Sequence, residues 1–85
     1  MAIAENIPPI PASNASFRAR FEKVRAIANA GTAESRVAAL EYAAGLIKGT
    51  NTYNRMLRRY ASEALAEVRA TAAAAEAIAA FRLAA

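Results

Sequence analysis

The fold is decided by residues 53–83, which read YNRMLRRYASEALAEVRATAAAAEAIAAFRL. The stretch holds neither proline nor glycine, and its second half is dominated by alanine, the strongest helix former. At 100° per residue, one set of side chains falls within a band about 90° wide. Its members are Tyr53, Leu57, Tyr60, Ala64, Val68, Thr71, Ala75 and Ile78. The stretch predicts one long helix over 52–83 whose band faces a core.

Upstream, a first helix is predicted over 16–30. Three polar residues are candidates to cap its start, and its apolar residues recur at the three- and four-residue spacing of one helix face. The candidate caps are Ser13, Asn14 and Ser16, and the apolar face is Phe17, Phe21, Val24 and Ala28. Asn29-Ala30-Gly31 supplies the stop, because glycine readily takes the left-handed backbone that follows a helix.

A second helix is predicted over 33–48, capped by Thr32 and ended by Gly49. Its apolar residues lie on two sides instead of one. One side is Val37, Leu40, Ala44 and Ile47, and nearly opposite are Ala39, Tyr42 and Leu46. We therefore expect this helix to be sandwiched between other elements. We also expect Gly45, which weakens a helix interior, to allow one of those elements a close approach.

The first fifteen residues are predicted to form an extended arm, because proline favours a polyproline-like chain without internal hydrogen bonds. Its prolines are Pro8, Pro9 and Pro11, and its isoleucines are Ile3, Ile7 and Ile10. Two outcomes are open: a disordered or loosely docked arm, or one that lays its isoleucines on the body or on a neighbouring subunit. The expected fold class is all-α, a small three-helix domain over 16–85 with a proline-containing N-terminal arm over 1–15 and a long C-terminal helix.

Composition limits both the core and the chemistry. Alanine accounts for 26 of the 85 residues and larger apolar side chains for 22, so the core is small and burial against another chain would help it. Without cysteine or histidine, the chain lacks disulfides, thiolate or imidazole catalysts and the usual zinc ligands. It also lacks a glycine-rich phosphate loop. We expect a protein that is not an enzyme, with no metal, no cofactor and no small-molecule substrate.

The expected location is cytoplasmic. No segment is apolar enough to be predicted as a membrane span, since the C-terminal stretch contains Glu76 and Arg82 among weakly hydrophobic alanines. The first fifteen residues lack the basic start of a signal peptide.

The side of the long helix opposite its core band begins with an arginine cluster, Arg55, Arg58, Arg59 and Arg69. One interpretation is a solvated basic face, partly neutralised by a glutamate four residues after one arginine. The other joins the cluster to the turn at 49–52 in the outline of a helix-turn-helix. The residues predicted to bind a partner or nucleic acid are Asn51, Asn54, Arg55, Arg58, Arg59 and Arg69. Asn51 or Thr52 is also predicted to cap the long helix.

Further along the same side, alanines recur at alternating spacings of four and three, the rhythm of a close-packed helical seam. This alanine seam is Ala66, Ala70, Ala73, Ala77 and Ala80. The long helix would extend about 46 Å and the second helix about 24 Å, so about half of it should overhang. The seam predicts a helix–helix interface; the alternative is that alanine simply fills an exposed face.

These patterns favour a non-enzymatic helical protein that binds a protein partner stoichiometrically. We expect a regulator, inhibitor or assembly subunit of the kind carried by phages and mobile elements, acting through the long helix or through self-association. The alternative is a DNA-binding transcriptional regulator of helix-turn-helix type that uses residues 49–59.

Overall fold

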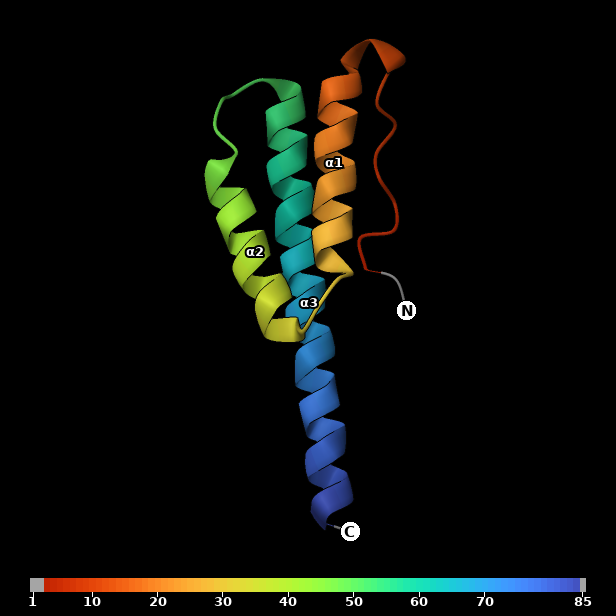
Figure 1. The fold of residues 1–85 in the computed structure, drawn as a ribbon, viewed down its shortest axis with the longest axis vertical. Helices are drawn as coiled ribbons and strands as arrows, with labels where there is room; N and C mark the ends of the chain where they lie inside the picture. The colour runs from red at the N-terminus through yellow and green to blue at the C-terminus, as the bar shows by residue number, and fades with distance from the viewer. Residues whose placement is uncertain (1–2, 85) are drawn as a thin grey trace.

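The computed structural model describes residues 3–84, which form an all-α bundle (Figure 1). An extended arm leads through a 3₁₀ turn, η1 (Ala12–Asn14), into α1 (Ala15–Ala28), α2 (Ala33–Leu46) and α3 (Thr52–Ala84). Figure 1 shows α1 descending, α2 ascending, and α3 descending again and continuing well past both. The predicted fold class is confirmed, including the proline-containing arm and the long last helix. No helix within residues 3–84 combines the length and apolarity needed to cross a membrane.

Local capping sets where the helices begin and end. The Thr32 hydroxyl accepts a hydrogen bond from the Ser35 amide at 3.1 Å, and the Asn51 side chain accepts one from the Asn54 amide at 2.8 Å. Both are the cap interactions expected from the sequence. Asn14 precedes α1, but its side-chain Nδ2 donates to the Tyr53 hydroxyl at 3.1 Å, and its side chain does not cap the helix. The predicted ranges for the first two helices extend two residues too far.

The core lies between α1, α2 and the inner side of α3. Its largest fully buried side chains are Phe21, Leu40 and Val68, one from each helix. The Phe21 ring packs against Tyr60 with 5.2 Å between ring centroids, and Phe17 stacks on Tyr53 at 5.3 Å. Aromatic pairs at such separations add to the energy of simple burial. The predicted core band of α3 is therefore confirmed over its first half.

The second half of the band is exposed, so that part of the prediction was wrong. Thr71, Ala75 and Ile78 are exposed, because no other element within residues 3–84 covers them. Helices α1 and α2 have 14 residues each and α3 has 33, which correspond to about 21 Å and about 50 Å. The expected overhang is present, and the whole structure is 55 Å long.

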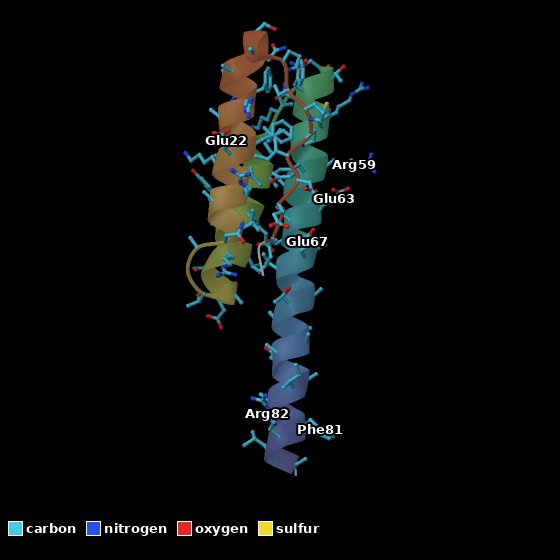
Figure 2. The ribbon with its side chains drawn as sticks, turned by 90° about the vertical axis from the view of Figure 1, so that its right-hand side faces the viewer. Glu22, Arg59, Glu63, Glu67, Phe81 and Arg82 are labelled. Carbon is cyan, nitrogen blue, oxygen red and sulfur yellow. The ribbon has the colours of Figure 1, made fainter. Side chains whose placement is uncertain are left out.

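The arm docks on the body instead of lying free. Ile3, Ala4 and Ile10 are buried. The Asn29 side chain accepts from the Ile3 amide and donates to the Ile3 carbonyl, both at 2.8 Å. The Ala4 amide donates to Glu67 at 3.1 Å, and the Tyr60 hydroxyl donates to the Ala4 carbonyl. Figure 2 shows the arm running along α3 beside Glu63 and Glu67.

Helix α2 is not sandwiched, contrary to the expectation from its two apolar sides. Leu40 is fully buried on the inner side, whereas Tyr42 is 73% and Leu46 62% exposed on the outer side. The expected close approach to Gly45 is also absent, since a Cβ added there would meet no atom within 4 Å. Sequence periodicity marks which sides are apolar, but the number of covering elements depends on the whole chain.

We predict that Gly45→Ala raises the free energy of unfolding by about 1 kcal/mol, because alanine is the better helix former and the new methyl group meets open space. Chemical denaturation followed by circular dichroism measures the change. Gly31→Ala is the matched control and should destabilise the protein. Gly31 has φ +84°, and a Cβ there would lie 2.6 Å from the Ser35 hydroxyl oxygen. A neutral or destabilising Gly45→Ala would contradict the open environment of this helix face.

We predict that Tyr60→Phe lowers the free energy of unfolding by about 1 kcal/mol, the usual net contribution of one hydrogen bond. Burial raises the pKa of Tyr60; the Arg25 charge opposes this shift and the Glu67 charge adds to it. A raised pKa means that the folded state holds the proton more tightly. The protonated hydroxyl therefore adds to the free energy of unfolding. That stabilisation is fully present below about pH 10, the pKa of an unfolded tyrosine, and is lost as the pH rises through the raised pKa.

Urea denaturation between neutral and alkaline pH tests this expectation. The wild type should lose more stability above about pH 10 than Tyr60→Phe does. Tyr42→Phe, which changes a largely exposed tyrosine, is the control and should follow the wild type. Equal alkaline losses in all three proteins would contradict the role given to Tyr60.

Candidate functional site

The arginine cluster on α3 does not form one free cationic surface. Arg58 folds back and donates from Nη1 to the Gly49 carbonyl at 2.6 Å, which ties the α2–α3 loop to the first turns of α3. Arg69 reaches across to α2 and pairs with Glu41. Two of the four predicted binding arginines therefore connect parts of the bundle.

The other two arginines point to solvent. Arg59 pairs with Glu63 at 3.1 Å along α3, which confirms the predicted neutralisation within the helix. Both side chains of that pair are largely exposed, so it contributes little to stability. Arg55 is exposed and has no ion pair or side-chain hydrogen bond within residues 3–84. It is the one member of the cluster left fully available to a ligand in the described part of the chain.

The two predicted asparagines serve the start of α3. Asn51 caps the helix, because its side-chain oxygen accepts a hydrogen bond from the backbone N–H of Asn54. Asn54 itself is 9% exposed. The loop and the first turn are thus built largely from residues that the sequence also suggested for nucleic-acid contacts. Figure 1 shows α2 and α3 as an antiparallel pair, whereas the helices of a helix-turn-helix cross at about 90–120°.

The alanine seam lies entirely on the surface. Its five residues, Ala66, Ala70, Ala73, Ala77 and Ala80, are exposed. From Ala73 to Ala84 every residue is exposed, and we call this segment the C-terminal overhang. Its large apolar side chains are 54% exposed at Ile78, 76% at Phe81 and 89% at Leu83. Figure 2 shows Phe81 and Arg82 far below the body of the bundle.

The carboxylate pair Glu63 and Glu67 is used within the fold. Glu63 accepts from Arg59, and Glu67 accepts from the backbone amide of Ala4. Among residues 3–84, no group of three or more carboxylate, histidine or cysteine side chains is placed to hold a metal ion. Glu67 therefore helps to hold the arm, and Glu63 pairs with a neighbouring arginine on the exposed surface of α3.

A groove between α1 and α2 is the surface that sequence reasoning did not identify. It encloses about 480 Å³ and is lined on its open side by Tyr42 and Leu46 from α2. Three cations, Arg20, Lys23 and Lys48, also line it, and no carboxylate does. The signal that could have revealed it is the second apolar side of α2, which residues 3–84 leave uncovered.

Mutation should distinguish the arginines that connect parts of the bundle from those that are free. We predict that Arg58→Ala lowers the free energy of unfolding by about 1 kcal/mol, because the Gly49 carbonyl loses its donor and the loop its tie to α3. Arg55→Ala, the matched control, should stay within about 0.5 kcal/mol of the wild type. Thermal and urea denaturation measure both. Equal effects of the two changes would refute the division of the cluster into connecting and free arginines.

No protein-family model, curated protein or solved structure matches this chain. The candidate binding surfaces of the described residues are those that the fold leaves uncovered: the C-terminal overhang, the groove between α1 and α2, and the free guanidinium of Arg55.

Proposed function

We propose that this chain is a non-enzymatic binding protein that engages a protein partner stoichiometrically through the C-terminal overhang. One observation carries the proposal. Helix α3 continues unbroken to Ala84, although no other described element covers it beyond Ala72, and it presents three large apolar side chains there. Exposed apolar surface of this kind marks interaction sites in soluble proteins.

A continuous apolar stripe begins just before the overhang and runs along it. Ala70, Ala74, Ala77, Ile78 and Phe81 follow the spacing i, i+4, i+7, i+8, i+11, so they share one side of α3. The small alanines allow another helix backbone to approach closely, and Ile78 and Phe81 supply most of the area that a partner would bury. The stripe shares Ala70 and Ala77 with the predicted alanine seam. The stripe and the alanine seam together form a surface that suits a partner contributing a helix.

Charge has a small part in this interface. Between Ala73 and Ala84 the charged residues are Glu76 and Arg82, whose formal charges cancel. A partner would thus be selected by shape and apolar packing. Such a mode fits a regulator, an inhibitor or an assembly subunit, including one that assembles with copies of itself.

The nucleic-acid alternative receives less support from the same residues. Arg58, Arg69 and Asn51 have partners within the chain, so contacting phosphates would compete with contacts that hold the bundle together. A titration against random duplex DNA at several salt concentrations tests this alternative directly. Affinity that falls steeply with salt would favour it, because cations that neutralise phosphates release counterions.

The protein-binding proposal is tested with Ala73→Glu combined with Ala77→Glu, which places two charges on the seam. Light scattering of the purified protein measures self-association, and affinity capture from the native host measures binding to another protein. We expect one of the two assays to show a complex that the double variant loses. The helix should persist by circular dichroism, because glutamate is also a good helix former.

The matched control is Ala79→Glu, compared with Ala77→Glu alone. Each adds one charge to the same exposed segment, but Ala79 lies on the side of α3 opposite the stripe. The control should keep the complex that Ala77→Glu weakens. The proposal fails if the wild type is monomeric and captures no protein, or if Ala77→Glu and Ala79→Glu weaken binding equally.

A further inference from the structure

The α1–α2 groove is a second surface, separate from the C-terminal overhang, and its walls are two helical stripes. Arg20, Lys23, Val24 and Ile27 line it from α1, and Ala39, Tyr42, Ala43 and Leu46 line it from α2. Each set has the spacing i, i+3, i+4, i+7, which is one helix face followed for two turns. The groove therefore runs along the helix axes, and its form matches a further helix lying between α1 and α2.

The base of this groove is mostly apolar. Val24 and Leu57 are buried there, Ile27 and Ile47 are half-buried, and Asn54 is the buried polar residue among them. Tyr42 and Leu46 stand at its edge with most of their surface in water. Helix α2 has apolar residues on two sides, and the described chain covers one of them. The uncovered side, with Tyr42 and Leu46, is the one that lines the groove.

The charge at the groove has one sign. Arg20 and Lys23 stand on the α1 wall, Lys48 follows the end of α2, and no aspartate or glutamate lines the groove. None of these three cations forms an ion pair within residues 3–84. The Arg20 guanidinium carbon lies 5.1 Å from the centre of the Phe17 ring, which places that charge beside apolar surface.

We propose that the α1–α2 groove docks an acidic amphipathic helix of a partner protein. Apolar side chains of that helix would cover Tyr42 and Leu46 and contact the base of the groove. Carboxylates on its flanks would face Arg20, Lys23 and Lys48. An apolar strip bordered by unpaired cations complements an apolar strip bordered by carboxylates, and docking in a groove is a common mode of helix recognition.

Two other occupants fit the groove less well. The C-terminal overhang of a second copy carries one carboxylate, Glu76, and so leaves most of the cations unmatched. Nucleic acid would match the cations but would leave Leu46 against a phosphate backbone. The acidic helix satisfies both the charge and the apolar surface.

The test uses a fluorescein-labelled alanine-based helical peptide with leucines at i, i+3 and i+7 and glutamates on both flanks. Fluorescence anisotropy with the full chain should show saturable binding. A peptide with glutamine in place of every glutamate should bind at least about tenfold more weakly at low salt. Lys23→Glu and Leu46→Ala should each weaken binding of the acidic peptide by about tenfold, one through charge and the other through apolar contact.

Arg55→Glu is the matched control for Lys23→Glu, because it makes the same charge change at an exposed site outside the groove. It should leave peptide affinity nearly unchanged. The Ala73→Glu, Ala77→Glu protein should also bind the peptide normally, which separates the groove from the overhang. Circular dichroism and urea denaturation confirm that each variant is folded.

Several outcomes would overturn the proposal. They are no saturation at about 1 mM protein, equal affinity for the acidic and glutamine peptides, and an equal loss with Arg55→Glu and Lys23→Glu. A fourth is a wild-type protein that light scattering shows to be larger than a monomer and that becomes monomeric with Leu46→Ala. The groove would then be filled by a second copy of the chain.

Discussion

Tyr60 contacts three parts of the chain at once, namely α1, α3 and the N-terminal arm. It lies on α3, its ring packs against Phe21 of α1, and its hydroxyl donates to the carbonyl of Ala4 in the arm. Ala4 itself has φ +54°, a left-handed backbone that alanine takes only when its surroundings hold it there. The bonds from Tyr60 and to Glu67 hold both polar backbone groups of that residue. With so few large apolar side chains, a three-helix body needs this fourth covering segment.

Because the arm covers one side of the bundle, the two sides differ in how much apolar surface is buried. The arm places Ile3, Ala4 and Ile10 in the core, where they add to the burial made by α1 and α3. Helix α2 receives no such cover, and Leu40 is its one buried residue. Its outer apolar residues remain in water and line the groove. The same shortage of covering segments therefore explains both the docked arm and the exposed side of α2.

Local sequence predicted the features that depend on a few neighbouring residues. Thr32 and Asn51 cap their helices because a hydroxyl or amide oxygen reaches an amide three residues ahead, whatever the rest of the fold does. The roles of Arg58 and Arg69 were not predictable, because their partners are a loop carbonyl nine residues away and a glutamate on α2. The open space beside Gly45 likewise depends on where other helices end. Spacing along one helix contains none of that information.

Alanine has different consequences in the two halves of α3. In the first half, Ala61 and Ala64 are buried and let α1 and α2 approach the helix closely. In the overhang no other element within residues 3–84 covers the helix, so its persistence depends on intrinsic propensity, which is highest for alanine because alanine loses no side-chain entropy. Short helices without tertiary contacts are marginal in water, but this one continues a helix already fixed by its buried half. A partner would therefore meet Ile78 and Phe81 on a helix that is already formed, and binding would not carry the cost of folding it.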